Sequence, residues 1–588
     1  MVAEMEVEME RGSSSGQSEE NQKLVPRRRK GGIVTMPFIL ANESFEKVAS
    51  YGLLPNMILY LITEYKMGVT QGTDILFYWS AATNFMPVVG AFVGDSYFGR
   101  FLTIGIGSII SFTGMVLLWL TAMIPGARPA SSCKSAAGVG CKSASPAQYG
   151  LLLSSFAIMS IGAGGIRPCS IAFGADQIDK KNPNYERVLE SFFGWYYASA
   201  LISVMIALTA IVAIQDSMGW KVGFGVPAIL MFCSTILFFV ASPLYVKMKV
   251  SKSLFIGLAQ TIVVTFKNRK LAFPPQDSTG SYHHEKDSEL VAPSAYLRFI
   301  NKACIIKNPE DITQDGIAAN PWSLCTVQQV EELKALVKVI PMWSTGIMLS
   351  INMSQSSFPL LQAKSMDRRF ISNFKIPAGS FGMFTIASLF IWVVLYDRVI
   401  LPLASKLKGK PVRLGVKERM GIGLFFSTMS MVVSGIVENI RRRKAIDQGL
   451  QNNPNAIVDM SAMWLVPQYA LSGIAEAFNA IGQTEFYYTE FPRSMSSIAS
   501  SLVGLGMAVA NLLASVILNT VDNATKKHGK ESWVSTNINQ GRYENYYWLL
   551  AVMSLVNMVY FVFCSWLYGP LQKTSRLRRK DDIEKEEE

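Results

Sequence analysis

Apolar runs of about 20 residues recur along this chain of 588 residues and leave few folds open to it. A helix needs about 20 mostly apolar residues to cross a bilayer, and only helices and closed barrels pair all their backbone groups there. Charged residues make up 17% of the chain, against about 25% in soluble proteins. The sequence therefore predicts an all-α membrane protein with twelve transmembrane helices. The expected spans are about 33–63, 72–94, 101–124, 148–172, 191–214, 221–243, 334–357, 377–396, 418–439, 461–484, 496–520 and 545–568.

A polar connection of about 90 residues divides these spans into two groups of six. Two groups of equal size are typical of transporters built from similar halves. We therefore expect two six-helix lobes. The expected segments are a cytoplasmic N-terminal tail 1–30, an N-terminal lobe 31–243, a central cytoplasmic connection 244–333, a C-terminal lobe 334–568 and a cytoplasmic C-terminal tail 569–588.

The basic residues lie mostly between the spans. The chain holds 55 Lys and Arg against 43 Asp and Glu, for a net charge of +12. Cytoplasmic loops of membrane proteins are rich in Lys and Arg, so this rule explains the charge better than nucleic-acid binding does. Arg27–Lys30, residues 397–419 and Lys573–Lys580 place both termini in the cytoplasm. Arg441–Lys444 contradicts this topology, because the loop after the ninth span would lie outside.

Three charged side chains, those of Glu43, Glu46 and Lys47, interrupt the first span. The apolar run after Lys47 holds only roughly 16 residues, so a full span must extend back through these charges. Their spacing of three and four residues places them on one helical face. One interpretation is an ion pair that only stabilises the helix. Ionisable groups inside a span usually face a cavity or a transport path, so we favour a functional cluster.

The turn Gly90–Arg100, between the second and third spans, resembles the loop motif of the major facilitator superfamily. Its glycines allow close helix approach. Asp95 and Arg100 would gate the cytoplasmic side through charge interactions with the neighbouring helix ends. The alternative is an ordinary basic loop without a gating role.

Five further motifs occur in chain order. They are Glu43–Lys47 as E-x-x-E-K, Gly164–Pro168 with Phe173–Gln177, Phe192–Tyr197, Pro467–Tyr469 with Glu476, and Thr489–Pro492. Together they resemble the proton-coupled oligopeptide transporter family over about residues 31–568. Four stretches are most similar to its plant branch, the nitrate and peptide transporter family, and to the first subfamily, where nitrate transport is the described activity. These stretches are Phe45–Asn56, Val188–Tyr197, Pro341–Gln355 and Gln483–Met495.

The resemblance implies a role for each matching residue. Glu43, Glu46, Lys47 and Glu476 would form the proton-coupling set. Arg167 stands where the family usually has a lysine that faces the first span. Because a guanidinium stays charged, Arg167 would be a fixed partner for the glutamates or for an anionic substrate.

The seventh span departs from the nitrate-transporting pattern. Relatives that bind nitrate can carry a histidine at the position of Met353, which has no charge. Nitrate would then be held by Arg167 or Lys47, with hydrogen bonds from Asn352, Ser354 and Gln355. This departure weakens the case for nitrate.

Several positions suggest modification. Thr103 follows Arg100 by three residues and matches a phosphorylated position in a relative, which implies a regulatory kinase as partner. A capping role for Thr103 is the alternative. Asn523 begins the sequon Asn-Ala-Thr on the expected outside face, and Cys133 and Cys141 share an outside loop and could form a disulfide.

We therefore expect a proton-coupled symporter that imports nitrate by alternating access, with protons as the coupling ion and no other cofactor or metal. Its partners would be a small anion and the lipid bilayer, in the plasma membrane or else the vacuolar membrane; the oligomeric state stays open. The alternatives are the same fold carrying a peptide, gibberellin, abscisic acid or another organic anion, and a non-transporting sensor. No nucleophile–base pair, metal set or phosphate loop favours an enzyme.

Overall fold

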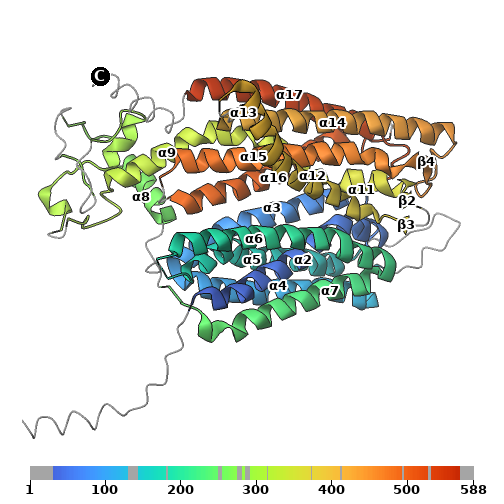
Figure 1. Cartoon of the computed structure of the whole chain (residues 1–588), viewed down its shortest axis with the longest axis horizontal. Coiled ribbons are helices and arrows are strands. Elements are labelled where there is room, and N and C mark those ends of the chain that lie inside the picture. The colour runs from blue at the N-terminus through green and yellow to red at the C-terminus, as the bar shows by residue number, and fades with distance from the viewer. Residues whose placement is uncertain are drawn as a thin grey trace, which may run out of the picture.

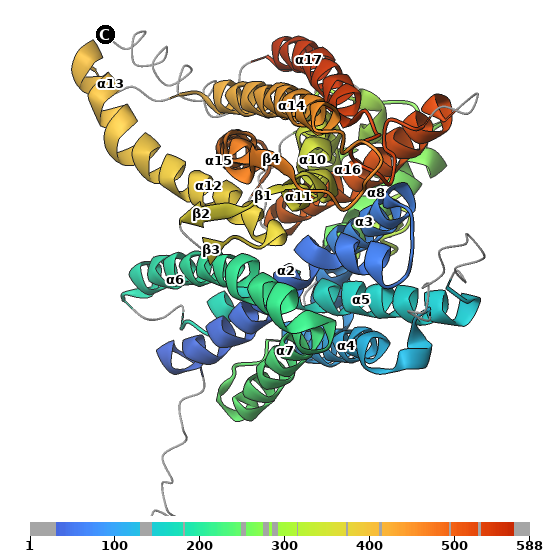
Figure 2. The same ribbon diagram turned by 90° about the vertical axis from the view of Figure 1, so that its right-hand side faces the viewer.

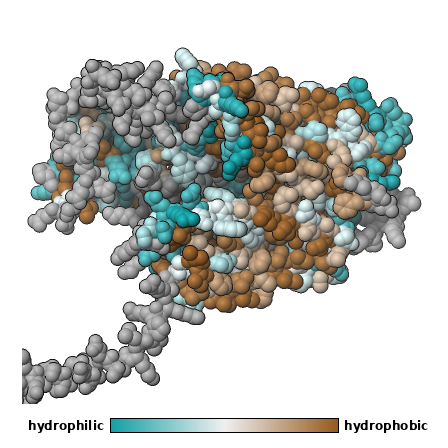
Figure 3. Space-filling view, in the orientation of Figure 1, coloured by the Kyte–Doolittle hydropathy of each residue, from teal (hydrophilic) through white to brown (hydrophobic). Residues whose placement is uncertain are grey.

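The computed structural model describes residues 31–129, 144–179, 183–248, 254–274, 281–284, 292–313, 316–371, 374–410, 414–492, 495–526 and 531–569. Long helices run side by side in two adjacent bundles, one from each half of the chain (Figures 1 and 2). Figure 3 shows a largely hydrophobic surface over the bundles, with hydrophilic residues gathered toward their ends. This surface suits contact with lipid. The tails 1–30 and 570–588, and the expected pair Cys133 and Cys141, lie outside the described residues.

The N-terminal bundle has six long helices within the described residues. They are α2 (Met36–Thr63), α3 (Val69–Val93), α4 (Gly99–Met123), α5 (Pro146–Asp176), α6 (Tyr185–Ile206) and α7 (Val212–Val240). Short π-helical turns join some of them, η2 (Gly94–Phe98) between α3 and α4 and η4 (Ala207–Ile211) between α6 and α7. The backbone at Gly219 has a φ of 77° and bends α7, a conformation that glycine adopts without strain.

Glycines bring α3, α4 and α5 unusually close together. A Cβ atom on Gly90 would lie 1.8 Å from the carbonyl oxygen of Gly164. That carbonyl has no helical donor four residues later, because Pro168 lacks an N–H group. Since neighbouring helices can come this near only where side chains are absent, the Gly-rich stretch before Arg167 fixes how α5 packs.

The C-terminal bundle is more broken. Its helices are α9 (Val327–Thr345), α10 (Ile347–Ser354), α11 (Ser357–Lys364), α12 (Met383–Leu395), α13 (Leu401–Lys408), α14 (Val416–Asp447), α15 (Val466–Glu490), α16 (Ser496–Thr525) and α17 (Tyr543–Tyr568). The turn η10 (Tyr396–Ile400) joins α12 to α13. The seventh expected span is bent by 43° between α9 and the α10–α11 segment.

Each of the twelve expected spans overlaps one of these helices or helix pairs. By length and composition alone, the described residues hold seven helical segments able to cross a membrane, or eight when the bent pair counts as one span. Two of these segments, Val69–Met123 and Tyr185–Leu244, each contain two expected spans. Helices α2 and α15 do not qualify by this measure. They carry the charged residues of the expected site, which lower their apolar character.

Short strands, which the sequence did not suggest, cover one end of the bundles. Strand β1 (Met366–Asp367) pairs in parallel with β4 (Val458–Ser461), and β2 (Arg369–Ile371) pairs antiparallel with β3 (Phe374–Lys375). Helix α8 (Leu254–Lys267) and the 3-10 helix η7 (Arg298–Ala303), from the central connection, lie at the opposite end against α9 (Figure 1). Helix α9 begins at Val327, earlier than expected, so part of the predicted connection is helical.

The basic cluster Arg441–Lys444 lies inside α14, not in a loop. Arg441 is fully buried and forms an ion pair with Glu438, with 2.7 Å between guanidinium and carboxylate. Arg442 pairs with Glu544 at 3.4 Å. Two of the four charges are therefore neutralised by partners within the protein. The orientation rule counts Lys and Arg in short loops and near span ends, whereas these four residues lie in a helix; the expected topology stays a prediction.

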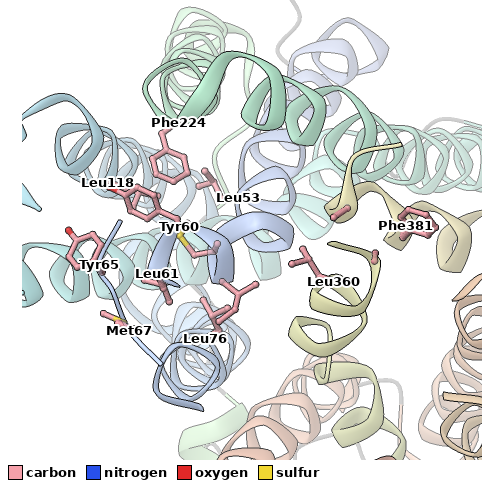
Figure 4. Close-up of a cluster of buried hydrophobic side chains, with 14 of the residues drawn as sticks. Leu53, Tyr60, Leu61, Tyr65, Met67, Leu76, Leu118, Phe224, Leu360 and Phe381 are labelled. Carbon is pink, nitrogen blue, oxygen red and sulfur yellow. The ribbon is translucent and has the colours of Figure 1, made fainter. Parts of the chain in front are cut away.

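The largest apolar core spans both halves of the chain. It joins residues of α2, α4, α5 and α7 to residues of α11, α14 and the strands at the covered end. Figure 4 shows part of this cluster, with Leu53, Tyr60 and Leu61 from α2 and with Leu360 and Phe381 from the C-terminal half. Apolar packing therefore joins the two bundles at the end that carries the strands.

Candidate functional site

The charged face of α2 is buried inside the N-terminal bundle. Lys47 Nζ lies 2.9 Å from Glu43 Oε1, four residues earlier on the same face. The Glu43 side chain is 1% exposed. A carboxylate that is removed from water needs a charged partner to remain ionised, and Lys47 provides it. The structure thus brings these two residues together as the spacing predicts.

A second ion pair joins α2 to α5. Arg167 Nη2 lies 3.4 Å from Glu46 Oε1, and the Glu46 side chain is 0% exposed. Ser50 Oγ donates to the same carboxylate oxygen at 2.7 Å. The Tyr51 ring lies beside both cations, with its centroid 5.4 Å from Arg167 and 5.9 Å from Lys47. The two acids and the two bases therefore form one compact cluster without net charge.

A cavity of about 350 Å³ lies next to this cluster, between the bundles. Arg167 from the N-terminal half and Glu476 and Met353 from the C-terminal half share its wall. Polar groups on the wall include Ser50, Ser80, Thr83, Asn84, Ser350, Ser354 and Asn511, and apolar groups include Leu53, Trp79, Met115, Met159 and Met507. Within the described part of the chain Glu476 forms no ion pair. The cavity thus has one paired cation on one wall and one unpaired acid on the other.

Two residues that we expected at the cavity point elsewhere. Asn352 Nδ2 donates to Ser427 Oγ at 2.9 Å and to Ser554 Oγ at 2.8 Å. Gln355 donates to the Ile351 carbonyl oxygen and accepts from a tyrosine of α17. Both side chains are buried among C-terminal helices. Met353 does line the cavity, because α10 starts after the bend and turns that face toward the other bundle.

Comparison with known proteins decides the family. The model of the POT family, PTR2, matches residues 101–534, well over half of the chain. The chain belongs to the POT family.

Relatives cover the whole chain. The protein NRT1/PTR FAMILY 1.2 of Arabidopsis thaliana is 62% identical over 586 residues, which is 99% of this chain and 96% of the relative. NRT1/PTR FAMILY 1.1 of the same plant is 63% identical over 572 residues, 96% of each chain. The chain is therefore a proton-dependent, multi-span secondary transporter and not an enzyme.

Solved structures share the fold. An auto-inhibited POT family peptide transporter matches with a TM-score of 0.66 at 20% identity, over 90% of this chain and 96% of its own. The POT family transporter PepTSo matches with a TM-score of 0.66 at 16% identity, over 91% and 98%. At these identities the likeness concerns the fold.

The expected gating residues lie within one bundle of the transporter. Arg100 contacts Asp95 of η2 at 3.2 Å and Asp176 of α5 at 2.8 Å. The sequence analysis missed Asp176, although it lies within a family motif, Phe173–Gln177. In this conformation the three charges hold η2, α4 and α5 together, and among the described residues they form no ion pair with the C-terminal bundle.

The expected modification sites differ in access. Thr103 is buried in the second turn of α4, and its hydroxyl donates to the Gly99 carbonyl oxygen at 2.9 Å. The residue that precedes α4 is Phe98 and no side chain caps this helix, so the capping alternative is wrong. Asn523 is exposed on the last turn of α16. The hydroxyl of Thr525 donates to the Val521 carbonyl oxygen at 2.7 Å. Phosphorylation and glycosylation both stay predictions.

Polar contacts between the bundles occur near the end that carries the strands, and the sequence analysis missed them. Asp74 of α3 accepts hydrogen bonds from Ser515 and, at 3.0 Å, from Asn519 of α16. Arg368 of the C-terminal half lies 3.8 Å from Asp216 of α7. Single charged residues at helix ends gave no signal in the sequence that these would meet. With the shared apolar core, they close the cavity at this end.

Proposed function

We propose that this POT-family transporter imports nitrate together with protons by alternating access. The observation that supports this most is the Arg167–Glu46 pair on the cavity wall. Arg167 stays charged at every physiological pH, so it supplies a permanent cation for an anion. Glu46 competes with the substrate for that cation until it is protonated.

The transport cycle follows from this competition. When the cavity is open to the outside, a proton on Glu46 neutralises the carboxylate and releases Arg167. The guanidinium then offers planar, paired donors to the oxygens of nitrate. The bundles rock about the cavity, and loss of the proton to the cytoplasm restores the Arg167–Glu46 pair. The restored pair displaces the anion, which couples each transport event to proton movement.

The membrane potential sets the number of protons. Moving one charge across 100 mV changes the free energy by about 2.3 kcal/mol. Inward nitrate movement with one proton is electrically neutral, whereas movement with two protons is driven by an inside-negative potential. Glu46, buried behind Arg167, and Glu476, on the opposite wall of the cavity, are the two acids that we assign to these protons. Lys47 keeps Glu43 ionised and so positions the cluster.

The cavity favours a second candidate, an organic anion. Nitrate has four non-hydrogen atoms, whereas cavities of about 300–1,000 Å³ enclose drug-sized ligands. Four methionines line this cavity, and Met353 takes the place of a titratable histidine. Flexible thioethers fit apolar groups of varied shape. A carboxylate on Arg167 with an aliphatic or aromatic body against the methionines would use the whole volume.

Uptake of ¹⁵N-nitrate and substrate-evoked current in oocytes test the proposal. Wild type should show inward current and label uptake that increase in acidic medium. Glu46→Gln should abolish proton-driven uptake, because an amide at position 46 cannot take up and release the proton that breaks and restores the pair with Arg167. Glu64→Gln is the matched control, since Glu64 ends the same helix and pairs with Arg128 at 2.6 Å, outside the cavity.

Competition separates the candidates. Excess unlabelled monocarboxylates should leave ¹⁵N-nitrate uptake unchanged if nitrate is the substrate. No current and no uptake of nitrate, with the protein at the plasma membrane that we propose as its location, would refute nitrate transport. Signalling that survives Glu46→Gln would favour the sensor alternative, because a pure sensor needs no proton cycle. A fluorescent fusion shows which membrane holds the protein.

A further inference from the structure

Helix α15 carries a polar stripe that begins at the cavity and ends at the end of the bundle where the central connection lies. Its members are Glu476, Asn479, Gln483, Tyr487 and Glu490, at successive steps of three, four, four and three residues. Such steps keep residues on one helical face. Asn479, Gln483, Tyr487 and Glu490 are all less than a tenth exposed. The stripe therefore faces the interior of the C-terminal bundle and not the lipid.

The first three members of the stripe border a small second cavity of about 50 Å³. Glu476, Asn479 and Gln483 line it, together with Ser350 and Gly346 from the bent seventh span. A cavity of roughly 10–15 Å³ already holds a water molecule when polar partners are present, so this one has room for a few. Gly346 matters here, because a Cβ atom on it would lie 2.0 Å from Gln483 Nε2. Glu476 lines both cavities and so connects them.

The fourth member of the stripe, Tyr487, has a hydroxyl without a hydrogen-bond partner among the described residues. Tyr487 is 1% exposed, and its Oη has no hydrogen-bond partner among the residues that the structure describes. A buried polar group without a partner costs about 1–3 kcal/mol, so a phenylalanine would suit a purely apolar role better. Along the helix, Tyr487 stands between Gln483 and Glu490.

The stripe ends in a charged group, at the end of the bundle where the central connection lies. Glu490 Oε2 accepts from Tyr568 Oη at 2.5 Å and lies 3.3 Å from Lys338 Nζ. Lys338 is partly exposed, and Lys417 lies over the Tyr568 ring at 5.0 Å. These charged and titratable groups, from α9, α14 and α17, surround the lower end of α15. Glu490 is thus a buried acid with a partly exposed partner.

We propose that this stripe conducts the proton of Glu476 to the cytoplasm inside the C-terminal bundle, apart from the path of the substrate. The proposal rests on the proposed function only in that Glu476 carries a coupling proton. The Cβ atoms of neighbouring members lie about 5–6 Å apart along the helix. Water molecules that hydrogen-bond to the side chains at about 2.8 Å would link the polar ends of successive members.

The proton moves by exchange of bonds. The O–H bond of protonated Glu476 breaks as a new O–H bond forms on a water held by Asn479 and Gln483, whose amides orient it. Tyr487 accepts a proton on its oxygen and gives its own hydroxyl proton to a water on the far side. The Glu490 carboxylate accepts the proton and releases it to cytoplasmic water. Each group except Glu476 ends in its starting protonation state.

Infrared spectroscopy of purified protein after a rapid pH jump tests the route without any substrate. The band of the protonated Glu476 carboxyl is identified by its loss in Glu476→Gln. Deprotonation of Glu476 should slow at least tenfold in Tyr487→Phe and in Gln483→Met, which remove the polar groups and keep the volume. Tyr488→Phe is the matched control, because the next side chain is 58% exposed and faces away from the stripe.

A second readout compares two transport modes in vesicles with ¹⁵N-nitrate. Tyr487→Phe should lose most proton-driven uptake but retain counterflow, which exchanges substrate without net proton movement. Wild-type deprotonation rates in Tyr487→Phe and Gln483→Met would overturn the route. Equal slowing in Tyr488→Phe would overturn it as well. If wild type does not transport nitrate, the infrared experiment still tests the proton route, because it needs no substrate. The nitrate proposal and the proton-route proposal can therefore fail independently.

Discussion

The ion pair inside α14 allows a quantitative prediction. Glu438 and Arg441 both have side chains that are 0% exposed, and two hydrogen bonds of 2.7 and 2.8 Å connect them. Arg441 also donates to the side chains of Ser365 and Asn539 and to the Ile538 carbonyl oxygen. The guanidinium thus joins α14 to the segment after α11 and to the loop before α17. Arg441→Met keeps an unbranched apolar stem and removes the charge and all these donors.

The expected cost follows from the burial of the remaining partner. Removal of one member of a buried ion pair costs about 3–5 kcal/mol, because the other charge is left uncompensated. With an unfolding entropy of about 2.1 cal/mol/K per residue, 4 kcal/mol lowers the unfolding midpoint by about 3 °C if the whole chain unfolds together, and by about 8 °C if the C-terminal half unfolds alone.

Thermal unfolding in detergent, followed by size-exclusion chromatography, measures this shift. Arg443→Met is the control, since the Arg443 side chain is exposed two residues away on the same helix. Its midpoint should change little. The double variant Glu438→Gln with Arg441→Met should be more stable than Arg441→Met alone, because no carboxylate is then left without its cation. A midpoint of Arg441→Met equal to that of the control, or a double variant that shows the sum of both losses, would refute the reasoning.

Three further predictions concern other parts of the transporter. Thr103→Asp should reduce uptake severely, because the carboxylate would replace a buried hydroxyl, whereas Thr103→Ser should transport as wild type does; surface-normalised uptake measures both. Asp74→Ala should loosen the contact between α3 and α16, so amide hydrogen exchange in the first turns of α3 should accelerate. Unchanged exchange would show that Asp74 does not hold the two bundles together at the end that carries the strands. Burial raises the pKa of the Cys304 thiol to about 12 and that of Cys325 to about 11. Unfolded thiols titrate near pH 8.5. The contribution of the two neutral thiols to the free energy of unfolding is therefore complete below about pH 8.5 and is lost as the pH rises toward 11–12. The unfolding midpoint should fall less across this range in the double variant Cys304→Ala with Cys325→Ala than in wild type.

The helices were predictable from sequence because apolar runs in a bilayer have few alternatives. The Lys47–Glu43 contact was predictable for the same reason, since it depends only on spacing within one helix. The contact of Arg167 with Glu46 joins two helices, and only the resemblance to a family indicated it. Sequence spacing carries no information on which faces of separate helices meet.

The misplaced residues share one physical cause. Asn352 and Gln355 lie three residues apart and share one helical face, whereas Met353 is turned about 100° away from Asn352. Asn352 therefore meets serines of α14 and α17, while Met353 meets the cavity. Arg441 was assigned to a loop because its charge suggested exposure. Its partner Glu438 lies one turn earlier, which makes burial tolerable.

The buried charges of α2 also bear on how the protein enters the membrane. Of the described long helices, α2 is made before the others, and each charge near the middle of a span adds up to about 3 kcal/mol to the free energy of insertion. Glu43 and Lys47 can neutralise each other within the helix. The partner of Glu46 is Arg167, which lies more than a hundred residues later in the chain and is made later. Stable integration of the first span is therefore a late event, completed only when α5 arrives beside it.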